Sequence, residues 1–222
     1  MMTHLYKFNS IFLVLMTFAF SACKKDEPVI ETYAEYDATI YSLKYTNNTL
    51  PEPNLPEDNP LTVQKILLGK MLFHDENVSK NGEMSCATCH IQIDGFSDRR
   101  QFSVGVEGLN GARQAMAIFN MAWHENGFFW DGRAELLRHQ SVLPIQDPLE
   151  MNETMDNLID KLTNKKIYTN QFIRAFGDDL IDENRISLAL EAFMMTIISD
   201  DSKYDQYLAG KVTLTESEER GK

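Results

Sequence analysis

The sequence has 222 residues, of which 43% are hydrophobic, and this is enough to bury the core of one or two compact domains. A formal net charge of −12 excludes non-specific binding to nucleic acid as the expected activity. Three cysteines are too few for a scaffold held together by disulfides. The acidic surface indicates either a solubility device or a docking face for a basic protein partner.

Residues 1–22 are typical of an export signal. A mildly basic start precedes an apolar run over residues 11–22, which is shorter than the roughly 20 residues needed to span a bilayer. "FSAC" then resembles the lipobox of bacterial lipoproteins, with Phe20 where Leu is usual. By this resemblance residues 1–22 are a lipoprotein signal peptide and Cys23 is the lipid anchor of an exported, periplasmic or cell-envelope lipoprotein. An ordinary secretory signal is the alternative.

A polar segment rich in proline follows at residues 23–60. It holds five of the seven prolines in the sequence, separated by Asn, Asp and Glu. Such stretches stay extended and do not pack a core. We therefore expect residues 23–60 to form a disordered tether.

The sequence from residue 61 onward predicts helices and few strands. Apolar residues recur at helical spacing in the segments 61–75, 134–143, 155–166, 170–177 and 184–199. Pro144 is expected to end the second of these helices. In the last, Ile186, Leu190, Phe193 and Ile197 form one apolar face that belongs in the core. The predicted fold is all-α, with a domain at residues 61–205 and long loops around the cysteine pair.

The stretch "SCATCH", residues 85–90, carries the chemistry. Cys86 and Cys89 lie three residues apart, so one helical turn places both sulfurs on one face, and His90 follows directly. C-x-x-C-H is the signature of covalently attached c-type haem. A zinc site lacks a second cysteine pair, a thioredoxin-like pair lacks its βαβ setting, and a plain disulfide leaves His90 without a role.

Four segments carry a more specific resemblance. They are "LGKMLFHDENVSKNGEMSCATCH" (68–90), "DGFSD" (94–98), "SVGVEGLNGAR" (103–113) and "FFWDGRAELLRHQSVLPIQDPLEM" (128–151). Together they resemble the bacterial di-haem cytochrome c peroxidases, from about residue 65 to the end of the chain. That family has two cytochrome-c-like helical domains, in which long loops wrap one haem each. The N-terminal haem is peroxidatic, and the C-terminal haem receives electrons from a small donor protein.

The resemblance implies how the chain holds haem c. Cys86 and Cys89 would bind the peroxidatic haem, and His90 would be the proximal ligand of its iron. Arg133 is expected to pair with a haem propionate, with a surface salt bridge as the alternative.

The resemblance also implies the catalytic residues. Glu150 would be the distal acid and base, because a partly desolvated carboxylate has a pKa closer to neutrality and can take and return a proton. Gln140 would orient peroxide and stabilise the charge on the departing oxygen. Trp130 would lie between the two haems, in the electron path.

Two positions depart from the family pattern. Many members have a histidine in the loop after the haem motif, whereas residues 103–113 contain none, so we expect no histidine cap from this loop. His124 is a distant substitute. Gln114 stands where Asn is usual, at a position linked to calcium in relatives, and an amide oxygen still suits a hard cation. Calcium therefore stays open.

A second C-x-x-C-H motif does not occur in the sequence. The final stretch, "LTESEERGK" (214–222), resembles the opening helix of the family's second domain, so we expect residues 206–222 to begin a truncated second haem domain. One haem would bind to this chain and a second to the full-length protein.

The expected function is reduction of hydrogen peroxide to water with electrons from reduced cytochrome c or a similar carrier. The first alternative is a membrane-tethered mono-haem electron carrier with a Met as sixth ligand. The second is a di-haem maturation enzyme that oxidises protein tryptophans. No nucleic-acid partner is expected, and a homodimer stays open.

Overall fold

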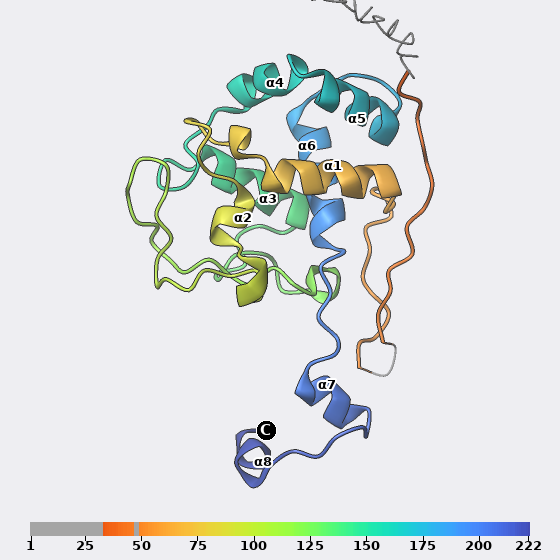
Figure 1. The fold of residues 1–222 in the computed structure, drawn as a ribbon, viewed down its shortest axis with the longest axis vertical. Coiled ribbons are helices and arrows are strands. Elements are labelled where there is room, and N and C mark those ends of the chain that lie inside the picture. Colours follow the sequence, from red (N-terminus) through yellow and green to blue (C-terminus); the bar gives the residue numbers. More distant parts are fainter. Residues whose placement is uncertain (1–32, 47–48) are drawn as a thin grey trace, which may run out of the picture. The chain divides into compact units, whose positions relative to one another are not determined.

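The computed structural model describes residues 33–46 and 49–222, and they form a helical body (Figure 1). Its elements are α1 (Val63–His74), η1 (Glu76–Val78), α2 (Cys86–Cys89), η2 (Gln92–Asp94), η3 (Met121–Trp123), α3 (Leu137–Gln146), α4 (Met155–Thr163), α5 (Lys166–Phe176), α6 (Glu183–Met194), α7 (Lys203–Leu208) and α8 (Glu216–Gly221). No β-strand forms within these described stretches, only isolated bridges. The all-α prediction is confirmed, including the long loops around the cysteine pair.

Helices α1 and α6 form the centre of the core, with α5 against α1 and α3 against α6 (Figure 1). Gly69 allows the central crossing, because a Cβ at this position would lie 1.9 Å from the carbonyl oxygen of Ala189. All four residues of the predicted apolar face are buried, so their place in the core is confirmed. The helix is shorter than predicted, because α6 ends at Met194 and Ile197 lies beyond it. Asp182 begins α6 as its N-cap, since its carboxylate accepts the backbone N–H of Arg185.

Helix α3 differs from its prediction, because it continues through Pro144 to Gln146. A proline inside a helix removes one N–H and so leaves one upstream carbonyl without its helical partner. The next turn still closes, since Asp147 donates its N–H to Leu143 at 3.0 Å. At the other end, Ala134 is not helical but forms a bridge with Phe128. The predicted helix at 134–143 is therefore displaced to 137–146.

The proline-rich segment also differs from its prediction. Over residues 33–46 and 49–60 it is hydrogen-bonded to the helical body and is no free tether there. Tyr41 donates its N–H to Leu61, and Asn54 donates to Ala122, both at 2.8 Å. The physical reason is that the helical body accepts hydrogen bonds from backbone N–H groups of the segment. In addition, polar side chains at the end of the segment take part in a buried charge network. Residues 23–32, Cys23 and the signal peptide lie outside the described residues.

That network joins the segment to three helices. Arg138 of α3 donates to Glu191 of α6 at 3.2 Å and forms two hydrogen bonds of 2.7 Å to Asp58. Asn59 donates to Glu191 at 2.9 Å and accepts from Lys65 of α1 at 2.8 Å. Apart from the exposed Asp58, these side chains are buried. A buried ion pair whose other polar atoms are hydrogen-bonded fixes the relative positions of the helices that carry it.

The C-terminal helices α7 and α8 have no buried residues and are linked by Lys203 and Glu218 at 2.7 Å. The assignment of residues 206–222 to a second haem domain stays a prediction. In the described part of the chain, no helix combines the length and apolarity needed to cross a bilayer.

Candidate functional site

A cavity of about 380 Å³ opens beside α2 and α3. It brings together side chains that are far apart in sequence: Cys89, His90, Trp130, Arg133, Gln140 and Glu150. A smaller cavity of about 40 Å³ adjoins it and is lined by Cys86 together with Cys89, His90, Gln140 and Glu150. All the site residues that the resemblance implies, apart from the lipid anchor, therefore lie around these two cavities.

Helix α2 is a single turn that holds both cysteines. Ser85 is the N-cap of this helix and is bonded to Thr88 in both directions. The Thr88 hydroxyl accepts the N–H of Ser85, and the Thr88 N–H donates to the Ser85 carbonyl, both at 3.0 Å. His90 closes the turn by donating its N–H to the carbonyl of Cys86 at 3.0 Å. Both cysteines are free thiols. The expected placement of two sulfurs on one helical turn is confirmed.

The ring of His90 is oriented by a backbone carbonyl. Its Nδ1 lies 3.0 Å from the carbonyl oxygen of Phe96, and Phe96 has a left-handed backbone with φ of 55°. Burial lowers the pKa of His90, which favours the neutral form of the ring. A neutral imidazole that donates through Nδ1 keeps its Nε2 lone pair for a metal.

These residues fit haem c. Burial raises the pKa of the Cys86 thiol to about 12, so this sulfur carries no charge. A thioether bond likewise leaves an uncharged sulfur, which suits a buried position. The larger cavity adds apolar walls from Ile118, Phe128 and Leu137. Two neutral sulfurs on one turn, an oriented neutral imidazole and an apolar cavity are together what covalent haem requires.

Glu150 and Gln140 line both cavities. Gln140 and Pro144 lie one turn apart on α3 and so share its cavity-facing side. Glu150 follows α3 in a turn in which its N–H bonds the carbonyl of Asp147 at 2.9 Å. Burial, helped by the negative charge of Asp147 and opposed by Arg133, raises the pKa of Glu150. A carboxyl with this shift can exchange a proton nearer to neutral pH.

The glycine-rich loop 103–113 is fastened to the backbone around Glu150. Val106 donates its N–H to the Glu150 carbonyl at 2.8 Å. Gly105 passes so close that a Cβ there would lie 2.1 Å from the carbonyl oxygen of Leu149. At the tip of the loop, Glu107 accepts from Lys80 at 2.6 Å and from Asn152 at 2.7 Å.

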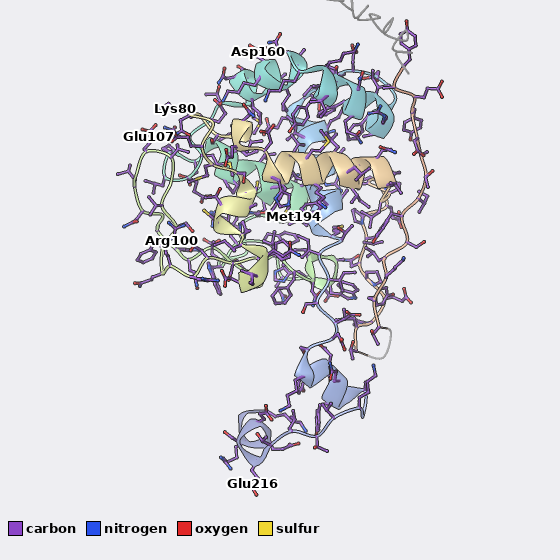
Figure 2. The ribbon with its side chains drawn as sticks, viewed as in Figure 1. Lys80, Arg100, Glu107, Asp160, Met194 and Glu216 are labelled. Atoms are coloured by element: carbon purple, nitrogen blue, oxygen red, sulfur yellow. The ribbon has the colours of Figure 1, made fainter. Side chains whose placement is uncertain are left out.

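Figure 2 shows Lys80 and Glu107 at the same edge of the body. Lys80 also donates its own N–H to the carbonyl of Met151 at 3.0 Å. The sequence gives no signal for this attachment, because the contacts join three separate loops through the backbone and through exposed charges. Gly105 and Glu107 are positioning residues that sequence reasoning missed.

Trp130 lies at the rim of the larger cavity, with 60% of its surface exposed. Its indole N–H donates to the carbonyl oxygen of Gln114 at 2.9 Å. The preceding Phe129 has a φ of 65°, which is rare for a bulky side chain and typical of functional sites. The predicted place of Trp130 between two haems stays a prediction. The side-chain nitrogen of Gln114 donates to the Asp98 carbonyl at 3.2 Å, and calcium binding stays a prediction too.

Arg133 and Arg113 meet at Asp131. Their guanidinium groups lie 3.0 and 2.9 Å from its carboxylate. The hydrogen bond from Arg133, with help from Arg113, holds the pKa of Asp131 down at about 2. Arg133 also lies over the ring of Phe129, 3.5 Å from its centroid. Both arginines line the cavity, so Arg133 forms a surface salt bridge here, and its pairing with a propionate stays a prediction.

His124 also lies at the cavity wall. Its Nε2 is 2.7 Å from the carbonyl oxygen of Gly127, and its ring packs against Phe128 with the centroids 5.3 Å apart. The loop 103–113 brings no histidine to the cavity, as its composition predicts.

Several known proteins are similar to this chain. The model of the family described as di-haem cytochrome c peroxidase matches residues 63–213. The methylamine utilization protein MauG of Methylophilus methylotrophus is 40% identical over 167 residues, which cover 75% of this chain and 50% of that protein. Cytochrome c peroxidase Ccp of Escherichia coli (strain K12) is 34% identical over 190 residues, or 85% and 40% of the two chains.

A solved structure is similar as well. The crystal structure of a MauG-like protein associated with microbial copper homeostasis has a TM-score of 0.70 and 34% identity, over 78% of this chain and 51% of that one. The chain spans half or less of the length of the curated relatives described above. The matched residues include the C-x-x-C-H turn and every residue that lines the larger cavity, Gln140 and Glu150 among them. The predicted membership is confirmed, and this chain belongs to the di-haem cytochrome c peroxidase family.

Proposed function

We propose that this chain is the peroxide-reducing half of a cytochrome c peroxidase, which reduces hydrogen peroxide to water. One observation carries the proposal: Glu150 and Gln140 line the same two cavities as Cys89 and His90. A proton-exchanging carboxyl and an amide thus lie where a molecule bound beside His90 would meet them. The names of the relatives from Escherichia coli and other bacteria support the same reaction.

Haem c, held by Cys86, Cys89 and His90, supplies the redox chemistry when it is bound. The residues of the chain move the protons. A carboxylate oxygen of Glu150 accepts the proton of the near peroxide oxygen and returns it to the departing oxygen, which leaves as water. The raised pKa of Glu150 lets one group perform both transfers. The side-chain N–H of Gln140 donates to the departing oxygen and stabilises the charge that develops on it.

The loop 103–113 contains no histidine, and we propose that it supplies no cap of the kind that many family members have. The loop 103–113 reaches Glu150 through backbone atoms alone. We therefore expect the ferric protein to react with peroxide without prior reduction. A ferric spectrum of low-spin haem with two histidine ligands would contradict this expectation.

The proposal extends to the partners of the full-length protein. A small carrier such as cytochrome c would supply electrons through a second haem, with Trp130 at the rim of this cavity as the link. Cys23 would anchor the exported protein to a membrane through lipid.

A second function, oxidation of tryptophan in a protein substrate, draws support from the relative named MauG at 40% identity. The third candidate, an electron carrier, would use a methionine as sixth ligand, and Met84, Met116 and Met121 line the cavity.

The test is to mix the reduced, haem-loaded protein with hydrogen peroxide and to follow haem oxidation by stopped-flow spectroscopy. Fast oxidation that is lost in Glu150→Ala and retained in Glu135→Ala supports the peroxidase, since Glu135 is exposed. A low-spin haem that does not react with peroxide would support the carrier. Fast oxidation that is unchanged in Glu150→Ala would contradict the role of this carboxyl.

A further inference from the structure

An aromatic pair lies beside the cavity without belonging to it. Trp123 and Tyr45 meet edge to face, with ring centroids 5.2 Å apart and planes inclined at 73°. The Tyr45 hydroxyl donates to the carboxylate of Glu52 at 3.0 Å. These residues come from η3 and from the segment that precedes α1, and none of them lines either cavity described above.

Trp123 lies between two residues of the cavity wall, directly before one and two positions after the other. Met121 begins η3 and His124 follows it, and both line the cavity. Ala122, between Met121 and Trp123, is buried, and Trp123 itself packs against the core. Consecutive Cα atoms are about 3.8 Å apart, so the backbone of Trp123 is one such step from His124 of the cavity wall, and its side chain packs against the core that borders the cavity.

Backbone contacts hold the two segments together. The indole N–H of Trp123 donates to the carbonyl oxygen of Pro51 at 2.7 Å. Asn54 donates its N–H to the carbonyl of Ala122 at 2.8 Å. The segment that carries Tyr45 and Glu52 is therefore attached to η3 at several points, and the ring contact is part of an ordered structure.

The Tyr45–Glu52 pair has the chemistry of a site that can lose an electron. A phenol that loses an electron becomes a strong acid, and its proton needs an acceptor within hydrogen-bond distance. Glu52 is that acceptor, because its carboxylate already accepts the phenolic hydrogen. Partial burial, with help from Glu52, raises the pKa of Tyr45, so the phenol keeps its proton until it is oxidised.

We propose that Tyr45 is a surface site of oxidation, connected to the haem cavity through Trp123. The proposal rests on the proposed function, since hydrogen peroxide is the oxidant. Reduction of peroxide to two waters takes up two electrons and two protons. Tyr45 supplies one of these electrons by way of Trp123, its phenolic proton passes to Glu52, and a neutral tyrosyl radical remains; a second turn of the same relay supplies the other electron and proton. A small phenol or hydroquinone at the surface then returns a hydrogen atom to Tyr45, and Glu52 releases its proton to water.

The experiment is to mix the ferric, haem-loaded protein with hydrogen peroxide in the absence of any donor, to freeze it within milliseconds and to record electron paramagnetic resonance spectra. We expect a tyrosyl signal that is lost in Tyr45→Phe and strongly reduced in Trp123→Phe. Glu52→Gln, which changes an exposed side chain, is expected to reduce it as well. Spin trapping followed by peptide mass spectrometry is expected to label Tyr45.

Tyr41→Phe is the matched control, because Tyr41 lies in the same segment and its hydroxyl is not part of the relay. It is expected to retain the signal. A tyrosyl signal that persists in Tyr45→Phe, or peroxide consumption with no tyrosyl signal, would overturn the relay and leave the proposed function standing. The absence of both peroxide consumption and radical would contradict the proposed function and the relay together.

Discussion

The backbone N–H of Val106 donates to the carbonyl oxygen of Glu150 at 2.8 Å. The glycine-rich loop and Glu150, the proposed proton-exchanging residue, are thus neighbours through their main chains, and we expect a displacement of one to displace the other. Because Gly105 and Glu107 fasten the same loop on either side of this bond, the position of Glu150 depends on a loop that is far from it in sequence.

Gly105→Ala tests this dependence. The new Cβ would lie 2.1 Å from the carbonyl oxygen of Leu149, and backbone atoms cannot yield as a flexible side chain does. We expect a loss of stability of about 1–3 kcal/mol and slower oxidation by peroxide, measured by thermal unfolding and stopped-flow spectroscopy. Gly111→Ala is the control in the same loop, since its nearest neighbour would be 3.7 Å away. Equal effects of the two substitutions would refute the positioning role.

Glu150→Gln keeps the shape of the side chain and removes its proton exchange. We expect the rate of haem oxidation by peroxide to fall by about 10²–10⁴. In the unchanged protein the rate is expected to fall as the pH drops through the raised pKa of Glu150, because the carboxylate is the base. This pH dependence should be absent from the variant.

The substitution Glu150→Gln, which is expected to slow the reaction, is expected to increase the stability of the fold. An acid whose pKa is raised by folding contributes stability at low pH that is lost as the pH rises through its folded pKa. Glu150→Gln is therefore expected to stabilise the fold at neutral pH, as measured by denaturant unfolding. A variant that is both inactive and destabilised would indicate a structural role instead.

Asp98 is expected to make the stability of the protein depend on pH in the acid range, through the loop that follows the haem motif. It is only 2% exposed and accepts from Arg100 and from the hydroxyl of Ser103 at 2.8 Å each. The hydrogen bonds from Arg100 hold its pKa down at about 2, against an ordinary value of 3.8. Its contribution to stability is thus present above the ordinary value and is lost as the pH falls towards 2.

We expect Asp98→Asn to lower the free energy of unfolding at pH 7 by roughly 1–3 kcal/mol. The difference from the unchanged protein should shrink as the pH falls from about 5 to 2. Asp160→Asn is the control, because Asp160 is exposed (Figure 2). An Asp98→Asn effect that is independent of pH would argue that packing, and not charge, is responsible.

Glu191→Ala tests the buried charge network. It leaves Arg138 buried without its partner in α6, and we expect a loss of about 3–5 kcal/mol in urea unfolding. Lys203→Ala breaks an exposed pair with Glu218 and is expected to cost no more than about 1 kcal/mol. A small effect of Glu191→Ala would mean that water or other groups replace the lost carboxylate.

Covalent attachment of haem to the two cysteines can be tested by removing one or both thiols. We expect Cys86→Ser or Cys89→Ser to leave at most one thioether bond, and the double variant to lose its haem on denaturing electrophoresis. The double variant should still fold, because serine is nearly the size of cysteine and both positions are only partly buried. Haem that stays with the denatured double variant would contradict attachment through this motif.

The placement of the haem-binding motif could be predicted from the sequence because it depends on local spacing. Cys86, Cys89 and His90 share one turn, and a turn follows from adjacent residues. The apolar face of α6 follows from helical period in the same way. Both kinds of prediction are confirmed.

The remaining features depend on contacts between distant segments. Pro144 remains inside α3 because tertiary packing outweighs its local cost. Residues 33–46 and 49–60 pack although their composition favours an open chain, because contacts such as the hydrogen bond from Asn59 to Glu191 join positions 132 residues apart. The close approach of Gly105 to Leu149 likewise has no local signal.

The residues that form the wall of the smaller cavity are synthesised at different times. Cys86 and Cys89 share this cavity with Leu190 and Met194 of α6, and synthesis proceeds from the N-terminus, so both thiols leave the ribosome well before the helix that covers them exists. Any group that is to be attached to these sulfurs can reach them in that interval without opening a finished core. Of the elements that line the smaller cavity, α6 is therefore the last to be synthesised.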